Sequence, residues 1–248
     1  MDSKDAFTTR VVEIDKIKTD KSVVICGFLG STPAGNLTAS YLIGEKKMHE
    51  VAHVRSPYLT PVAVFIGGKL RHPFRVYSGM EGKVIVMTCD IPIGPNGLYE
   101  ISSAVIDWLQ TLNISELVVL EGIPVDEVPD KRKTYGLAEP EGLAKLKSNG
   151  IEIADSALVT GMGGALISEC LSRKITASSL LTPMFVGYPD PETVLSLISA
   201  LNKLYAIDAS VDNLKEQVKK MHQEMNKIMD HYRSLKEEKT KDTDSLYM

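Results

Sequence analysis

The sequence lacks the features that mark several large classes of protein. No run approaches the roughly 18 consecutive apolar residues that a membrane-spanning helix needs, so we expect no membrane partner. The first residues, MDSKDAFTTR, mix both charge signs without an apolar stretch, which predicts no signal peptide. Positive charge is not in excess either, because 28 Lys and Arg face 32 Asp and Glu for a net charge of -4. This balance argues against a general nucleic-acid binder.

Cysteine is also scarce. The chain has three cysteines, Cys26, Cys89 and Cys170, which lie far apart and form no CxxC pair. Such isolated thiols are typical of reduced core residues in an intracellular protein. Together with the missing signal peptide, they predict a cytoplasmic location.

The composition that remains is that of a globular protein with a sizeable core. Of the 248 residues, 44% are hydrophobic and 24% are charged, which allows one large domain or a domain with an appendage. Residues 1–206 alternate short β-rich runs with helical patterns, so we expect an α/β domain whose central, largely parallel sheet is flanked by helices. The expected strands are 22–26, 62–66, 74–77, 83–89, 117–120, 157–160 and 175–181. The expected helices are 36–44, 97–112, 165–173 after the turn at 161–164, and 189–205, with a long mobile loop over 124–141.

Residues 207–238 carry a different pattern. From Ile207 onward, apolar residues recur at alternating spacings of four and three, which is a heptad over four repeats. We expect a helical rod of roughly 48 Å. Its stripe could pack on the α/β body, fold against the preceding helix as a hairpin, or pair with another subunit. An a/d-only stripe is narrow for a core helix, so we favour a helix–helix or inter-subunit seam. The expected seam residues are Val211, Leu214, Val218, Met221, Met225, Ile228, Tyr232 and Leu235.

The last ten residues, 239–248, form the third expected unit. Lys239 to Ser245 predict a polar tether, and the chain then closes on the apolar and aromatic residues Leu246, Tyr247 and Met248. Such residues are unusual in an exposed terminal segment, where small and polar side chains prevail.

One catalytic motif matches literally but in the wrong context. His49 to His53 read HExxH, which on a helix would place two imidazoles for zinc and a glutamate as general base. Pro57 follows closely, and residues before a proline resist helix, so we expect an extended segment here. Glu81 or Glu100 could supply a third ligand. We nevertheless predict no metal site.

Two glycine-rich turns offer only weak catalytic leads. The turn from Gly27 to Asn36 has Asn36-Leu37 where a phosphate-binding loop needs Lys and then Ser or Thr, so NTP hydrolysis loses its main electrostatic elements. We interpret this turn and Gly161–Gly164 as close strand–helix packing, with a weak anion site as the alternative.

Acidic residues and nucleophile motifs add little to the case for an enzyme. Asp90, Glu100 and Glu121 lie near strand ends, where we expect solvated carboxylates. The sequence has no GxSxG elbow. The chain therefore predicts no catalytic residues, no cofactor and no enzyme.

Four stretches together resemble the PAC2 family of proteasome assembly chaperones, in its archaeal type. They are VVICGFLGSTPAGNLTASYLI (23–43), HPFRVY (72–77), the GMGG turn (161–164) and GYPDPETVLSLISALNKLY (187–205). The resemblance covers roughly residues 20 to 206. It implies an α/β fold similar to that of purine nucleoside phosphorylases without their catalytic set, and assembly with itself into a homotetramer or homopentamer.

The resemblance also gives the tail a role. Some archaeal members of the family end in hydrophobic–Tyr–any residue, the signature with which proteasome activators dock between α-subunits of the 20S particle. Leu246, Tyr247 and Met248 fit that signature. The implied function is an ATP-independent proteasome assembly chaperone or activator. The alternatives are an oligomeric scaffold of the same family that binds another small protein, and a nucleoside-phosphorylase-like enzyme.

Overall fold

The computed structural model describes residues 8–127, 132–185 and 190–245. The strands are β1 (Arg10–Glu13), β2 (Ser22–Phe28), β3 (His49–Arg55), β4 (Val64–Ile66), β5 (Lys69–Arg71), β6 (Phe74–Gly79), β7 (Val84–Cys89), β8 (Ile114–Val125), β9 (Tyr135–Ala138), β10 (Glu152–Ile153) and β11 (Ala177–Phe185). The α-helices are α1 (Ala34–Glu45), α2 (Leu98–Leu109), α3 (Pro140–Ser148), α4 (Gly161–Arg173), α5 (Pro191–Tyr205) and α6 (Leu214–Ser245).

Within the described residues, one sheet of nine strands forms the centre of the molecule, in the order β1-β3-β6-β7-β2-β8-β11-β9-β10. The four central strands, β7, β2, β8 and β11, are parallel to one another. The pairs β1–β3, β3–β6, β6–β7 and β9–β11 are antiparallel. The sheet is therefore mixed, and the expectation of a largely parallel sheet holds only for its core. The antiparallel flank arises because no α-helix intervenes between β3, β6 and β7 along the chain.

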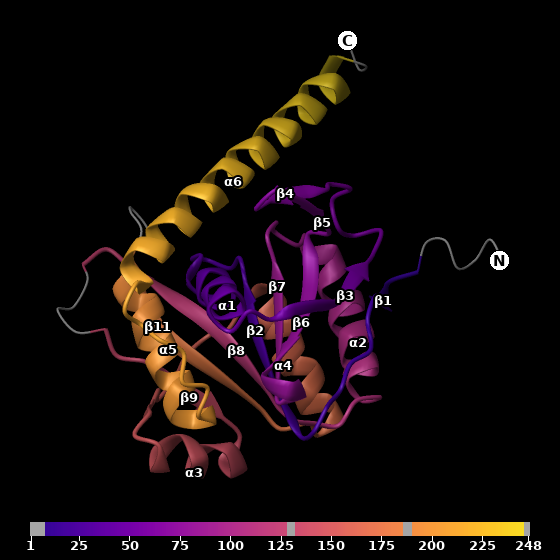
Figure 1. The fold of residues 1–248 in the computed structure, drawn as a ribbon. Coiled ribbons are helices and arrows are strands. Elements are labelled where there is room, and N and C mark those ends of the chain that lie inside the picture. The colour runs from indigo at the N-terminus through magenta and orange to yellow at the C-terminus, as the bar shows by residue number, and fades with distance from the viewer. Residues whose placement is uncertain (1–7, 128–131, 186–189, 246–248) are drawn as a thin grey trace.

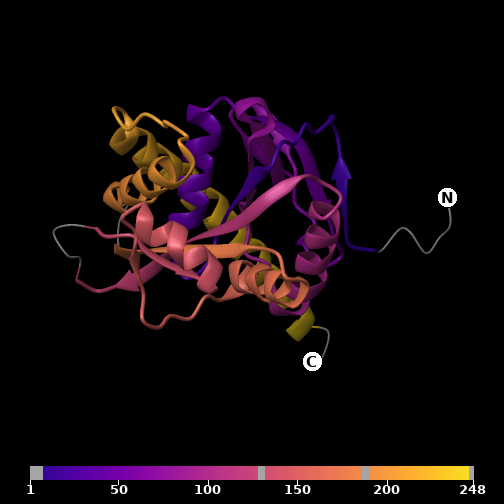
Figure 2. The ribbon, with the colours of Figure 1, turned by 90° about the horizontal axis from the view of Figure 1, so that it is seen from below.

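Helices cover both faces of the sheet (Figures 1 and 2). One face packs against α1, α5 and the start of α6, and the other against α2 and α4. Strands β2 and β7 between them are nearly continuous apolar runs, because both of their faces are buried. The prediction of an α/β domain is confirmed. Within the part of the chain that the structure describes, no helix is long and apolar enough to cross a bilayer.

Glycine allows α1 to lie directly on the sheet. A Cβ atom added to Gly27 would come within 2.1 Å of the Gly35 carbonyl oxygen, and one added to Gly35 within 2.2 Å of the Leu120 carbonyl oxygen. Asn36, where a phosphate-binding loop would have lysine, turns its amide inward and donates to Thr88 Oγ1 at 2.9 Å and to the Cys89 carbonyl oxygen at 3.1 Å. This part of the turn serves close strand–helix packing, as interpreted from the sequence.

Two local predictions are wrong. Residues 157–160 form no strand, because β9 pairs with the side of β11 that a further parallel strand would need. Leu158 is instead exposed. The expected loop over 124–141 contains β9 and the start of α3, and β8 extends to Val125. Residues 128–131 lie outside the described part of this segment.

The C-terminal helix also differs from its expected bounds. The stretch from Ala206 to Asn213 is not helical, because Ala206 and Asp208 adopt left-handed backbone conformations with φ of 48° and 52°. Helix α6 begins at Leu214 and continues through Ser245, so it includes residues 239–245, for which a polar tether was predicted. In Figure 1 it leaves the body diagonally.

Candidate functional site

The base of α6 is held to the body by a short connector. The Asn202 side chain on α5 donates to the Ala209 carbonyl oxygen and accepts from the Ala209 amide, both at 3.0 Å. Tyr41 on α1 donates its hydroxyl to the Ser210 carbonyl oxygen at 2.6 Å. Lys46, just after α1, donates to the Asp208 carbonyl oxygen at 2.7 Å. The Ser210 amide also donates to Glu45 at 3.2 Å, so hydrogen bonds from α5, α1 and the residue just after α1 fix the backbone from which α6 starts.

The first part of the predicted seam makes contacts within this chain. Leu214 and Val218 are fully buried in the cluster that α6 forms with α1 and α5, and Met221 packs against the same cluster. Leu214 and Val218 have no surface left for another subunit, so this half of the stripe makes intramolecular helix–helix contacts. Val211 precedes the helix and is 39% exposed.

The second part of the seam is described only at Ile228, which is half-buried. The side chains of Met225, Tyr232 and Leu235 lie outside the described ones. Pairing of this part with another subunit stays a prediction.

Beneath α6 lies a cavity of about 200 Å³ with a buried ion pair in its wall. Arg75 donates through Nη1 to Asp90 Oδ2 at 2.5 Å and to the His72 carbonyl oxygen at 2.6 Å, and through Nε to the Tyr77 hydroxyl at 2.9 Å. Burial disfavours the guanidinium charge, but the pairing with Asp90 outweighs it and raises the pKa of Arg75. This pair joins β6 to the end of β7, and α6 covers it with Met221, Glu224 and Ile228.

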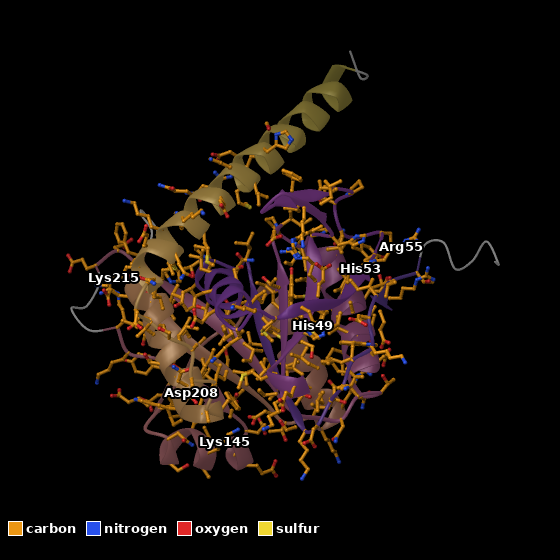
Figure 3. The ribbon with its side chains drawn as sticks, in the orientation of Figure 1. His49, His53, Arg55, Lys145, Asp208 and Lys215 are labelled. Atoms are coloured by element: carbon orange, nitrogen blue, oxygen red, sulfur yellow. The ribbon has the colours of Figure 1, made fainter. Side chains whose placement is uncertain are left out.

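The HExxH sequence lies on strand β3, so the expected extended conformation is confirmed (Figure 3). His53 stacks on His72 with ring centroids 3.6 Å apart, and burial followed by the neighbouring imidazole lowers the pKa of His53. Across the described residues, no three His, Cys, Asp or Glu side chains are placed to hold a metal ion.

The three cysteines are free and buried, which confirms their prediction as core residues. Burial raises the pKa of the Cys89 and Cys170 thiols to about 12, which leaves both as weak nucleophiles at neutral pH.

The stretches that resemble a known family now have places in the fold. Residues 23–43 form β2 and most of α1, residues 72–77 lead into β6, and residues 161–164 begin α4. The PAC2 family model matches residues 24–229, which is most of the chain. The chain belongs to the PAC2 family. The match extends beyond Tyr205 into α6, so the base of this helix is part of the family's domain.

Several solved structures are similar to this PAC2 protein. A Thermoplasma acidophilum protein of unknown function is 45% identical, with a TM-score of 0.85 over 90% of this chain and 91% of that chain. PbaA of Pyrococcus furiosus, an archaeal homolog of proteasome-assembly chaperone, is 24% identical, with a TM-score of 0.77 over 89% and 99%. PbaB of the same organism, an archaeal proteasome activator, is 19% identical, with a TM-score of 0.75 over 90% and 99%. The likeness to PbaA and PbaB shows a shared fold.

The predicted docking residues of this PAC2 protein, Leu246, Tyr247 and Met248, lie outside the described residues. Helix α6 leads to them and ends, in its described part, at Ser245. The likeness to purine nucleoside phosphorylases stays a prediction.

Sequence reasoning was wrong about two acids. Asp90 and Glu121 are buried rather than solvated, whereas Glu100 is exposed. The signal that could have found both buried acids is their place directly after apolar strand runs, VIVMTC before Asp90 and LVVL before Glu121.

Proposed function

We propose that this PAC2 protein is an ATP-independent proteasome assembly chaperone or activator that docks on the α-ring of the 20S proteasome through Leu246, Tyr247 and Met248. Membership of the family and the fold shared with PbaA and PbaB support a proteasome partner. The inward use of Asn36, at the position where a phosphate-binding loop has lysine, supports independence from ATP.

The observation that carries the proposal is the way in which α6 is attached to the body. The helix is 32 residues long and starts from a connector that α1 and α5 fix with hydrogen bonds. At 1.5 Å per residue it spans about 48 Å. Figure 1 shows its C-terminal end far from the sheet. A docking sequence that follows such a helix is presented at a distance from the body.

Docking of one such sequence combines several weak interactions. The α-carboxylate of a chain that ends at Met248 would pair with a lysine of the receiving pocket, and the Tyr247 ring would fill an apolar slot while its hydroxyl donates a hydrogen bond. A homotetramer or homopentamer carries several copies, and each bound copy raises the effective concentration of the next. Self-assembly is therefore part of the proposal.

The test compares 20S binding and peptide hydrolysis for three proteins: one that ends at Met248, one that lacks residues 246–248, and one with an alanine appended after Met248. We expect the deletion and the extension to lose binding alike, because the extension moves the carboxylate out of register.

Tyr247→Ala and the matched Asp242→Ala separate the role of the ring from a general effect on the tail. We expect only Tyr247→Ala to weaken binding, by at least tenfold. Equal binding by the full-length and shortened proteins would remove the docking proposal and favour a scaffold that binds another small protein.

A further inference from the structure

Both glycine-rich turns that stand out in the sequence meet at one carboxyl group, that of Glu121. This residue lies near the C-terminal end of β8, on the sheet face that α4 covers. A Cβ atom added to Gly30 would come within 2.9 Å of Glu121 Oε2, and one added to Gly163 within 2.7 Å of Oε1. A Cβ atom at either position would displace the carboxyl group from this place. The two turns therefore form a cradle around Glu121.

The Glu121 carboxyl has no partner within the described chain. Its side chain is almost fully buried, with the residue 9% exposed, and no hydrogen bond or ion pair to a described residue satisfies it. A buried charge is normally paired, because removing an isolated ion from water is costly. Burial accordingly raises the pKa of Glu121 to about 7. An unpaired acid that lines a cavity is able to take a partner from outside the chain.

Glu121 lines a cavity of about 220 Å³ at the C-terminal edge of the parallel strands. Its walls include the hydroxyl-bearing residues Ser31 and Thr160, and its apolar lining includes Ile123 and Leu158, the latter 86% exposed. The cavity thus combines one acid with apolar groups that reach the surface.

The charges around this cavity come from few sources. Glu121 of β8 is the one ionisable residue lining it among the described residues, with none from the β2–α1 turn, the 156–160 segment or β11. Burial alone accounts for the raised pKa of Glu121, without a contribution from another charged side chain. Helix α4 begins at Gly161 beside the cavity, and a helix N-terminus carries about half a positive charge. A full carboxylate charge exceeds this half charge, so the ionised cavity is net negative.

We propose that this cavity binds an alkyl cation, a primary ammonium or guanidinium group on a short methylene chain, with the cationic head paired to Glu121 and the chain packed on Ile123 and Leu158. An anion would be repelled by the carboxylate, and an apolar ligand would leave it unpaired. Amphipathic cations bury their stems along apolar surface in the same way. The cation is either a free small amine or a lysine or arginine side chain of another protein. This site is independent of residues 246–248.

Calorimetry with the full chain tests the site, using agmatine and putrescine as free cations and a capped Ala-Lys-Ala peptide as the side-chain probe. We expect saturable binding that is about tenfold stronger at pH 8 than at pH 6, because the ligand selects the ionised carboxylate of a group that titrates near 7. A proton should leave on binding at pH 6, seen as a heat that depends on the ionisation enthalpy of the buffer. Tighter binding of the free amines would identify a small molecule, and tighter binding of the peptide would identify a partner side chain.

Glu121→Gln keeps the shape of the side chain and removes its charge. We expect it to lose cation binding by more than tenfold and to lose the pH dependence, whereas Glu141→Gln, an exposed acid on α3, should bind as the unchanged protein does. Leu158→Ser alters the exposed rim without touching the core and should weaken binding several-fold. Binding of neither cation nor peptide at either pH, binding unchanged by Glu121→Gln, or phosphate binding more tightly than the amines would each overturn the proposal.

Discussion

Two buried acids show how differently one residue type behaves at the same edge of the sheet. Asp90 is paired with Arg75, and the guanidinium also bonds the Tyr77 hydroxyl and the His72 carbonyl oxygen. Glu121 has no such partner in the described chain and lies between Gly30 and Gly163. The first acid is part of the packed fold. Ionisation of the second acid, Glu121, costs free energy because burial removes its carboxylate from water.

That cost makes stability depend on pH. The pKa of Glu121 rises from 4.5 to about 7 on folding, so the folded state holds its proton over a range in which the unfolded state has lost it. The contribution of Glu121 to stability is fully present below pH 4.5 and is lost as the pH rises through about 7. We expect Glu121→Gln to gain roughly 2 to 3 kcal/mol in unfolding free energy relative to the unchanged protein between pH 5 and pH 8.

Urea unfolding at several pH values measures this gain. Glu100→Gln is the matched control, because Glu100 is exposed and should show no such gain. A parallel pH dependence in the unchanged protein and in Glu121→Gln would contradict the assignment.

At the scale of elements, α6 depends on its first two turns. Leu214 and Val218 are buried against α1 and α5. Leu214→Ala should lower the unfolding free energy by about 2 to 5 kcal/mol, because it leaves a cavity in this cluster. Val211→Ala, at an exposed position of the same heptad, should change it by less than about 0.5 kcal/mol.

Hydrogen exchange locates the effect of Leu214→Ala. Faster exchange along α6 with the sheet unchanged is the expected result. Equal effects of Leu214→Ala and Val211→Ala would show that α6 does not rest on this cluster.

The heptad shows both the reach and the limit of sequence reasoning. Apolar spacing predicted a helix with one buried stripe, and Leu214 and Val218 lie on it. The spacing continues without a break through Ile207 and Val211, although Ala206 and Asp208 take left-handed conformations that end the preceding helix and delay the next one. Backbone conformation at two ordinary residues leaves no mark in hydrophobic periodicity, so the start of α6 could not be read from it.

For the candidate sites too, the sequence showed the local motifs but not how the fold brings them together. The two glycine turns were visible as motifs, and their close packing follows from the residue type. Their meeting at Glu121 depends on the sheet order, which places β8 beside β2 and brings α4 over it. Long-range topology of this kind has no local signal. The strand predicted at 157–160 was wrong for the same reason: the position of this apolar stretch depends on long-range topology. Its residues line a cavity and do not join the sheet.

At the scale of the whole molecule, we expect the α/β domain to support self-assembly and residues 246–248 to bind the 20S proteasome. We expect light scattering to give the mass of a homotetramer or homopentamer for the full chain, and deletion of residues 246–248 to leave that mass unchanged while 20S binding is lost. The reason is that self-assembly requires larger buried surfaces than three residues supply. A monomer in either protein would contradict the multivalent part of the proposal.

The connector between α5 and α6 has a consequence for such an assembly. Asn202, Tyr41 and Lys46 bind its backbone from two sides, so the direction of α6 is a property of the folded body. In a symmetric assembly the helices would then emerge at one shared angle, and the distances between their ends would be set by symmetry. A ring of binding pockets with the same spacing would bind all the tails with little loss of conformational entropy. A ring of another diameter would bind them poorly, because the fixed bases of the helices do not let the helices change direction.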